Sequence, residues 1–285
     1  MHLDRFKFWL PPEVSVPWPR GAGQQAMLDA GDRQVQSLAV MRHPNIVALG
    51  QLLDDAECEA LINGARALIR RSSTFSDNNK KEVIHASRTS DGMFYQRGNN
   101  PWVTKVEERL SHLLNWPMEN GEGMQILRYG PGAEYKPHYD YFSPGSAGTP
   151  QILKRGGQRV ATVVMYLNTP EAGGSTVFPQ SKFDSMPVKG NAVFFNYSRA
   201  HPVSRSLHGG SPVLAGEKWL RSSGTASGHS TDVVCKDSSL EHAPAFHAQH
   251  LVAVLIEHFP QVAGHTHIGA AAHGLGFKHC CLQAQ

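Results

Sequence analysis

The stretch Gln125–Phe142, QILRYGPGAEYKPHYDYF, decides how this chain is to be interpreted. Its first residues, Gln125–Tyr129, alternate apolar and polar side chains as a strand does, and Gly130–Gly132 supplies a Gly-Pro-Gly turn after them. His138 and Asp140 follow, two residues apart. On an extended backbone such residues point to the same face, so the imidazole and the carboxylate are expected to converge on one point.

One imidazole and one carboxylate are two of the three ligands in the facial triad of non-haem Fe(II) oxygenases. By itself the triplet is also common on surface strands and turns, so a second imidazole must come from elsewhere in the chain. His201 precedes a proline in a polar loop and is interpreted as a turn residue. His208 stands just before a predicted strand over 211–215 and is the predicted third ligand.

The composition is that of a soluble globular protein. Of the 285 residues, 40% are hydrophobic and 18% are charged, and the formal net charge of +3 argues against a nucleic-acid partner. No window approaches the roughly 18 apolar residues of a membrane span, and the charged N-terminus does not resemble a secretory signal. We expect no membrane partner and a reducing, cytoplasmic setting, in which Cys58 is a buried thiol.

Shifts in composition divide the chain into four parts. Residues 1–43 begin rich in Pro and Gly, and are expected to be a flexible N-terminal arm with a short helix near Gln24–Leu28. Residues 44–120 are expected to form a helical and mixed layer, and 121–221 a barrel. Residues 222–285 are an atypical tail that holds nine of the 16 histidines.

Two amphipathic helices are predicted in the second part, both as scaffold. Asp54 and Glu57 have the spacing of a capping box at the start of a helix over 55–70. The second helix covers 101–114, with Pro101 in the first turn, where its missing N–H is tolerated.

From residue 124 onward the pattern changes to short strands separated by Gly, Pro, Asn and Ser. The continuous apolar run VATVVMYL predicts a central strand that is buried on both faces. Many short strands that follow the helices, rather than alternate with them, favour a sandwich or barrel with helices on one side. The predicted strands are 124–129, 134–140, 158–168, 174–178, 192–197 and 211–215.

Ten residues past His208 comes Lys218, which in Gly216-Glu217-Lys218 would otherwise be interpreted as a solvated turn lysine. Two histidines and one aspartate leave three positions open on a six-coordinate iron. A bidentate 2-oxoacid can take two of them and dioxygen the third. If that cosubstrate is a dicarboxylate, its far carboxylate needs a fixed cation, which a lysine deep in the barrel can supply.

Three motifs in this order resemble the prolyl 4-hydroxylases of the Fe(II)/2-oxoglutarate-dependent dioxygenase superfamily, especially bacterial members. They are the opening stretch, RGGQRVATVVMYLNTPEAGGSTVFP and LHGGSPVLAGEKW. The resemblance extends over about residues 44–220. It implies an α+β fold in which a double-stranded β-helix, a jelly-roll or cupin-like barrel, is supported by an N-terminal helical layer.

The resemblance also implies ligands for iron and for 2-oxoglutarate. Lys218 and Tyr129 would bind the distal carboxylate of 2-oxoglutarate, although an ordinary strand tyrosine is the alternative for Tyr129. Thr162, on the buried strand, would face the cosubstrate. The residues that would hold Fe(2+) are His138, Asp140 and His208.

By the same resemblance, Tyr135 and Arg159 would line a peptide groove near the iron, and Arg88 would contact that groove or anchor its own loop. The implied reaction consumes O2, converts 2-oxoglutarate to succinate and CO2, and hydroxylates proline in a peptide or protein. L-Ascorbate would rescue iron oxidised in uncoupled turnovers. A related hydroxylase acting on another amino-acid substrate is the alternative within the enzyme class.

The chain departs from the family after Trp219. Residues 221–228 have the composition of a loop, and Gly224 stands where the family pattern has a second tryptophan. The tail beyond is a divergent segment, a metal-binding appendage or the product of a frameshift; the frameshift is our working hypothesis. This departure leaves open a catalytically impaired iron-binding protein, and the histidine count a tail-driven metal chaperone.

Overall fold

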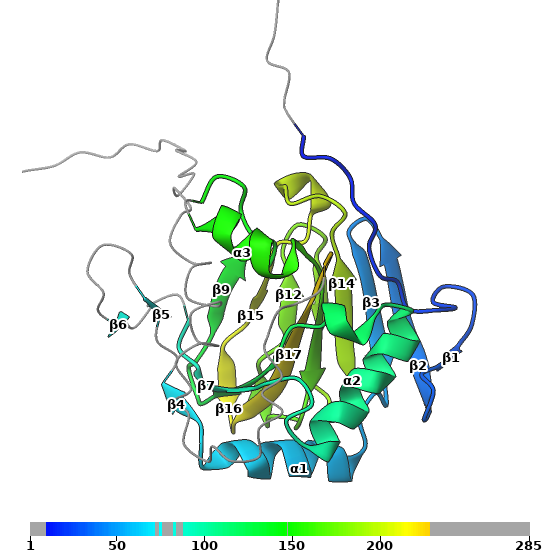
Figure 1. The fold of residues 1–285 in the computed structure, drawn as a ribbon. Helices are drawn as coiled ribbons and strands as arrows, with labels where there is room; N and C mark the ends of the chain where they lie inside the picture. Colours follow the sequence, from blue (N-terminus) through cyan, green and yellow to red (C-terminus); the bar gives the residue numbers. More distant parts are fainter. Residues whose placement is uncertain (1–9, 72–73, 76–81, 84–87, 147, 229–285) are drawn as a thin grey trace, which may run out of the picture.

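Two antiparallel sheets face each other and form a double-stranded β-helix (Figure 1). The computed structural model describes residues 10–71, 74–75, 82–83, 88–146 and 148–228. The order of the strands in the larger sheet is β1 (Met27–Asp29), β2 (Gln34–Arg42), β3 (Asn45–Gly50), β14 (Ala192–Asn196), β10 (Arg159–Tyr166), β17 (Lys218–Ala226), β8 (Met124–Tyr129), β7 (Asp91–Tyr95) and β4 (Arg70–Arg71).

The smaller sheet carries four strands in the order β13 (Phe183–Ser185), β12 (Thr176–Phe178), β15 (His208–Gly210) and β9 (Tyr135–His138). Two short pairs complete the strands, namely β11 (Ala172–Gly173) with β16 (Val213–Ala215), and β5 (Thr74–Phe75) with β6 (Glu82–Val83). An apolar core that includes Phe178, Phe195 and Tyr166 fills part of the space between the two sheets. The predicted barrel is therefore confirmed.

The centre of the larger sheet follows from the apolar runs in the sequence. In β10 every residue from Val160 to Tyr166 is buried, as the prediction of a strand buried on both faces requires. All five residues of β14 are buried as well. β10 lies between β14 and β17, and all its partners are antiparallel.

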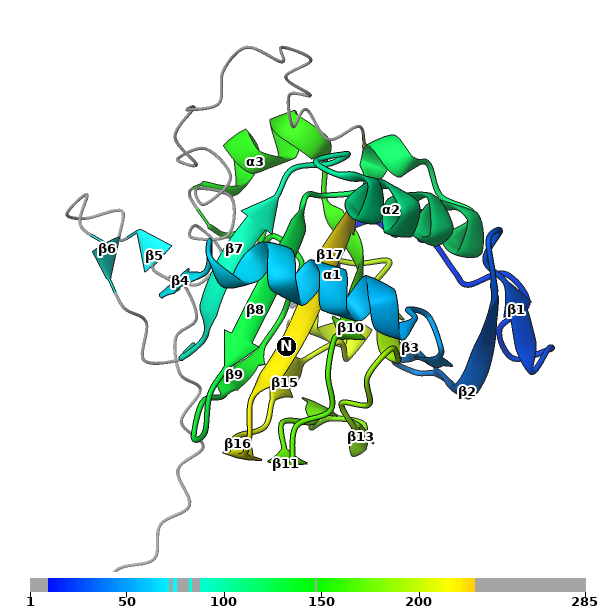
Figure 2. The same cartoon turned by 90° about the horizontal axis from the view of Figure 1, so that it is seen from below.

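Two helices cover the outer face of the larger sheet, as Figure 2 shows for α1 (Asp55–Arg66) and α2 (Pro101–Leu114). The capping box of α1 is confirmed, since the Asp54 side chain accepts from the Glu57 N–H at 2.8 Å and Glu57 accepts from the Asp54 N–H at 3.0 Å. The helix ends at Arg66, four residues earlier than predicted, while α2 has the predicted bounds. None of the described helices is long and apolar enough to cross a membrane.

The prediction of a flexible arm over residues 1–43 is wrong for its described portion. Instead of a helix near Gln24–Leu28, the chain forms β1 and β2, which extend the larger sheet beyond β3. Leu28 and Val35 are fully buried against the helices. The Pro and Gly residues at the start of the segment made the hairpin of β1 and β2 difficult to predict. Its strands are stabilised by the sheet that they join, and not by local propensity.

The loop predicted at 221–228 is also wrong, because β17 continues through Ala226. Its residues pair with β10 on one side as far as Ala226 and with β8 on the other as far as Ser222. Pairing on both sides outweighs the weak strand propensity of Ser and Gly. The tail from residue 229 onward lies outside the described residues.

The segment between β9 and β10 contains a third helix, α3 (Thr149–Gly156). Two short 3₁₀ turns, η1 (Met118–Asn120) and η2 (Pro202–Ser204), complete the described elements.

A buried charge cluster ties the N-terminal hairpin to both helices. The fully buried Arg109 of α2 donates to Asp32, which follows β1, at 2.7 Å and to Glu57 of α1 at 2.6 Å. Burial opposes ionisation of Glu57, but its hydrogen bonds to Arg109 and the Asp54 backbone outweigh burial and lower its pKa to about 2. The cluster explains how a Gly-rich segment becomes a fixed part of the fold.

Replacing Arg109 by Met should therefore destabilise the protein strongly. The substitution keeps most of the apolar volume but leaves Glu57 buried without its main partner, a change that typically costs about 3–5 kcal/mol in the free energy of unfolding. Because the ammonium of Lys105 lies 3.0 Å from the Glu57 carboxylate and still compensates part of its charge, we expect a loss at the lower end of this range. Urea denaturation measures it.

The matched control is Arg199→Met, which removes a partly exposed ion pair with Glu13 and a hydrogen bond to the Pro11 carbonyl and should lower the free energy of unfolding far less. Equal stability of the two variants would contradict the role assigned to the Arg109 cluster.

Candidate metal and cosubstrate site

The three predicted ligands lie together on the smaller sheet. β9 and β15 pair antiparallel with His138 directly opposite His208, so the register alone brings the two imidazoles side by side. Asp140 follows β9, and its carboxylate lies 3.4 Å from His138 Nε2 and 3.7 Å from His208 Nε2. The three ligand atoms lie within 4.8 Å of one another and could hold a metal ion.

Backbone carbonyls fix the tautomer of both histidines. His138 Nδ1 lies 2.9 Å from the Lys136 carbonyl, and His208 Nδ1 lies 3.0 Å from the Ser206 carbonyl. Because a carbonyl only accepts, each Nδ1 carries the proton and donates it. Each Nε2 then keeps its lone pair on the side of Asp140, as a neutral imidazole ligand requires.

Asp140 is partly buried, with 14% of its side chain exposed, and its carboxyl group is held in the ionised form. Burial alone would raise the pKa of its carboxyl group, but the neighbouring His208, His138 and Arg159 outweigh burial and hold that pKa well below its ordinary value. Thr162 Oγ1 donates to Asp140 Oδ2 at 2.8 Å, and Arg159 donates to the Asp140 carbonyl at 3.1 Å. Burial first, and His138 second, lower the pKa of His208 to about 4.

Lys218 is the buried cation that the sequence predicted. It begins β17 opposite Tyr129 of β8, and only 2% of its surface is exposed. Its ammonium donates to the Gly174 carbonyl and lies 5.6 Å from the ring centre of Tyr129 and 5.8 Å from that of Tyr166. No carboxylate among the described residues pairs with it, and burial lowers its pKa to about 8. An unpaired ammonium in such a place favours an anionic ligand.

A cavity of about 450 Å³ between the two sheets joins the ligands to the lysine. Both sheets contribute to its wall, the smaller one through β9, β12 and β15 and the larger one through β8, β10 and β17. All nine residues singled out from the sequence line it, namely Arg88, Tyr129, Tyr135, His138, Asp140, Arg159, Thr162, His208 and Lys218.

An aromatic and basic wall stands beside the histidines. The ring of Tyr135 stacks on the ring of His138, with centroids 3.7 Å apart. Arg88 is held by Gln125 at 3.0 Å and by Ser90 at 3.2 Å, and its guanidinium lies 5.2 Å from the centre of the Tyr135 ring. Both descriptions of Arg88 given by the sequence, groove residue and loop anchor, agree with this geometry.

Arg159 forms an ion pair with Glu122 that passes over Gly224. The shortest distance between the two side chains is 2.6 Å. A Cβ atom at position 224 would come 2.4 Å from Glu122 Oε2 and 2.5 Å from Arg159 Nε. The glycine that interrupts the family pattern therefore leaves room for this pair, and Arg159 reaches Asp140 from it.

Thr162, which the resemblance predicted to face the cosubstrate, lines the cavity at a distance from Lys218. It pairs with Gly224 on the neighbouring strand β17. Gly224 lies six residues, or roughly 20 Å, along that strand from Lys218. The Thr162 hydroxyl instead contacts Asp140. Thr176 of β12 pairs with Gly210, at which a Cβ atom would lie 3.9 Å from Lys218 Nζ. Thr176 lines the cavity and accepts a hydrogen bond from Tyr166 at 2.9 Å.

Sequence patterns did not single out four residues of the site, although two of them, Thr176 and Tyr166, lie in a motif that carried the resemblance. Thr176 lies near the end of that motif, in EAGGSTVFP. Tyr166 lies earlier in the same motif, whereas Glu122 and Tyr197 reach the site from segments that no motif marks.

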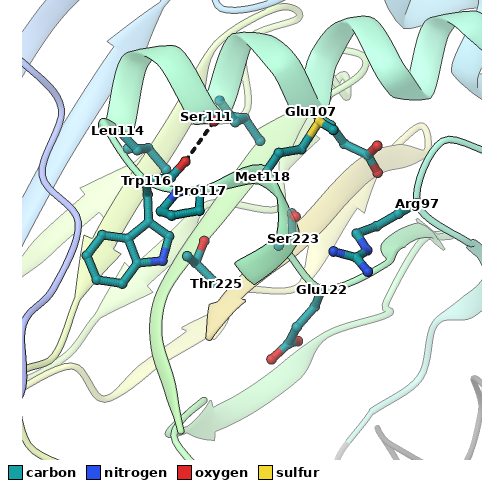
Figure 3. A pocket seen from close by; sticks show the side chains of 12 residues that line it. Arg97, Glu107, Ser111, Leu114, Trp116, Pro117, Met118, Glu122, Ser223 and Thr225 are labelled. Atoms are coloured by element: carbon teal, nitrogen blue, oxygen red, sulfur yellow. Dashed lines mark hydrogen bonds between the residues drawn. The ribbon is translucent and has the colours of Figure 1, made fainter. Parts of the chain in front are cut away.

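Two other candidates contribute no site. His201 caps η2 by accepting from the Val203 N–H at 3.1 Å, so its interpretation as a turn residue is confirmed. A second cavity, between α2, the segment after it and β17, is lined by Glu107, Met118 and Ser223 among others (Figure 3). Its volume of about 30 Å³ would admit one or two waters but no cosubstrate.

A double-stranded β-helix with a His-x-Asp pair, a distant His and a buried lysine defines a class of metal-dependent oxygenases. Residues 124–223 match the family described as the 2OG-Fe(II) oxygenase superfamily. Probable prolyl 4-hydroxylase 3 of Arabidopsis thaliana is 36% identical over 228 residues, which are 72% of this chain and 78% of that protein. The chain thus belongs to the prolyl 4-hydroxylase family of this superfamily.

Two further comparisons give the extent of the likeness. Prolyl 4-hydroxylase 2 of Arabidopsis thaliana is 37% identical over 203 residues, which are 63% of this chain and 66% of that protein. The chain therefore spans slightly less than two thirds of the length of that relative. The 2OG complex of the viral collagen prolyl hydroxylase of Paramecium Bursaria Chlorella virus-1 is 29% identical, covers 63% of this chain and 94% of its own, and has a TM-score of 0.48.

Proposed function

We propose that this protein is an Fe(II)- and 2-oxoglutarate-dependent dioxygenase that hydroxylates proline in a peptide or protein. The observation that carries the proposal is the placement of the His138, Asp140 and His208 cluster and of Lys218 in one cavity. Curated relatives of the chain are named prolyl 4-hydroxylases, which supports proline as the substrate.

The three ligands suit Fe(II). Two neutral imidazoles and one carboxylate form the 2-His-1-carboxylate set, which leaves positions open on the metal for substrate and dioxygen. The carbonyls behind the two imidazoles and the Thr162 hydroxyl behind the carboxylate supply the outer contacts that such ligands need. When bound, the iron and 2-oxoglutarate supply the oxidising chemistry, in which 2-oxoglutarate becomes succinate and CO2 while one oxygen atom enters the substrate.

The lysine end of the cavity suits 2-oxoglutarate. A Cβ atom built on Gly210, two residues beyond His208, would lie 3.9 Å from Lys218 Nζ, so the ammonium faces the cavity close to the metal ligands. In the proposed role, Lys218 pairs with the far carboxylate and the Tyr129 hydroxyl donates to it. The rings of Tyr129 and Tyr166 flank the ammonium and exclude water from the pair.

The opposite wall suits a peptide. Tyr135 presents an aromatic face beside His138, against which an apolar proline ring can pack. Arg88 and Arg159 add hydrogen-bond donors for peptide carbonyls, and each is held in place by a partner, Gln125 and Glu122 respectively. These residues orient the substrate, and they leave the oxidation to the metal.

The completeness of β17 supports an active barrel over an impaired one, because the strand beside Lys218 is paired on both sides. Ascorbate as the reductant that rescues oxidised iron, and a cytoplasmic setting, stay predictions. The free, buried thiol of Cys58 is consistent with a reducing compartment.

Turnover with Fe(II), 2-oxoglutarate and a proline-rich peptide tests the function. We expect succinate to form, and the peptide to gain the mass of one oxygen atom per modified proline. His208→Ala should reduce both products to background, because it removes one of three proposed ligands. The measurement is mass spectrometry of the peptide together with succinate quantification.

His201→Ala is the matched control, since it removes a histidine of the same region that only caps a turn, and it should keep wild-type turnover. A peptide in which alanine replaces proline should gain no oxygen. Equal activity of wild type and His208→Ala would contradict the proposed site, and oxidation of the alanine peptide would contradict proline as the target.

Binding of 2-oxoglutarate should weaken at alkaline pH. Burial lowers the pKa of Lys218 to about 8, so the ammonium that pairs with the carboxylate is present below this pH and is lost as the pH rises through it. Above about pH 8 the Kd for 2-oxoglutarate should rise about tenfold per pH unit. Anaerobic calorimetry with Co(II) in place of Fe(II) measures the Kd for 2-oxoglutarate at each pH.

Lys218→Arg keeps its charge over this range. It should bind 2-oxoglutarate more weakly than wild type at neutral pH, because the guanidinium has a different shape, but with a flat pH profile. A Kd of the wild type that does not change between about pH 7 and about pH 10 would rule out Lys218 as the carboxylate partner.

A further inference from the structure

We propose that Tyr197 is a positioning residue of the metal site: acting through Thr162, it fixes the Asp140 carboxylate and thereby strengthens binding of a divalent metal. The inference rests on the proposed function, because it takes Asp140 as a metal ligand. Tyr197 follows β14, on the opposite sheet from the three ligands, and nothing in its local sequence marks it as a site residue.

The contacts form a directed chain of hydroxyl groups. Thr162 Oγ1 lies 2.8 Å from Asp140 Oδ2 and 3.2 Å from the Tyr197 hydroxyl. A carboxylate only accepts, so the single proton of the Thr162 hydroxyl is directed to Asp140. Tyr197 must then be the donor to Thr162. The proton order, from Tyr197 to Thr162 to Asp140, is the only one that satisfies all three groups.

The two hydroxyl-bearing residues of the chain are buried. Tyr197 has 2% of its surface exposed and Thr162 has 1%. The backbone N–H of Tyr197 donates to the Val160 carbonyl at 2.9 Å, which ties it to β10, the strand that carries Thr162. The Tyr197 ring lies 6.3 Å from the ring of Phe195 and 5.9 Å from that of Tyr141. Its hydroxyl therefore has one fixed position, which is the one beside Thr162.

Fixing the Asp140 carboxylate before a metal ion binds should raise the affinity of the site for the metal. Without Tyr197 as a donor, the Thr162 hydroxyl can rotate away, and Asp140 loses a contact that holds its plane toward the two imidazoles. Outer partners of metal ligands typically change metal affinity by about 10–100-fold when they are removed. Tyr197 stands one step further out, so we expect a loss of about tenfold for Tyr197→Phe and a larger one for Thr162→Val.

The test is anaerobic titration of the full-length protein with Fe(II) or Co(II), followed by calorimetry, without cosubstrate or peptide. Tyr197→Phe deletes one oxygen and keeps the ring. Its matched control is Tyr141→Phe, in the same aromatic cluster, because the buried Tyr141 hydroxyl has no hydrogen-bond partner in the described part of the chain. The control should bind metal as the wild type does.

A second pair of variants keeps the test decisive if Tyr197→Phe folds poorly. Thr162→Val removes the relay and should weaken metal binding, whereas Thr162→Ser restores a hydroxyl at the same place and should rescue it. Thermal unfolding of the metal-free variants separates this role from simple packing, because a packing defect lowers the Tm of the metal-free protein and is not rescued by Ser in preference to Val.

Wild-type metal affinity in both Tyr197→Phe and Thr162→Val would overturn the inference. Equal losses in Tyr197→Phe and Tyr141→Phe would overturn it as well, since they would show that the cluster acts through packing. If the wild type itself bound no metal, the proposed function would fail together with the inference, and the wild-type titration alone would reveal that case.

Discussion

The antiparallel pairing of β17 with β10 and β8 is the constraint on which the rest of the structure depends. The strand begins at Lys218, opposite Tyr129, and ends at Ala226, opposite Arg159. One strand therefore spans the cavity from the cation at one end to the Glu122–Arg159 pair at the other. Without its second half, the wall that faces Asp140 would be missing.

Strand alternation makes β17 carry two buried cations on opposite faces. Lys218 points into the cavity, whereas Arg221 is fully buried on the face covered by the helices. Burial lowers the pKa of Arg221 to about 9, and among the described residues the nearest partner of its Nη1 is the sulfur of Met165, at 3.5 Å. The fold thus tolerates charge where the sheet is most firmly paired. A bound anion can compensate the charge of Lys218, because the face of β17 that carries Lys218 borders the large cavity.

The histidine pair owes its geometry to the smaller sheet in a similar way. The register between β9 and β15 places His138 opposite His208, and backbone carbonyls two residues earlier hold both rings. Sequence patterns predicted β9 and the two helices, because alternation and capping are local properties, whereas β15 precedes the strand predicted at 211–215. Motif order and the family resemblance indicated nine residues that line the cavity. They could not predict β1, β2, α3 or the end of β17, where neighbouring strands, the buried Arg109 cluster and packing decide the conformation.

By itself the sequence indicated the candidate ligand set, since the H-x-D spacing predicted that His138 and Asp140 converge, and motif order supplied His208 and Lys218. Because β9 ends at His138, Asp140 reaches the cluster from the residues after the strand. Only the tertiary structure decided which groups stand behind these residues. Tyr197, Thr162, Glu122 and Gly224 come from separate segments and meet only when β14, β10, β17 and the segment before β8 lie side by side in the larger sheet. Their contacts depend on the positions of side chains in space, which no local pattern encodes.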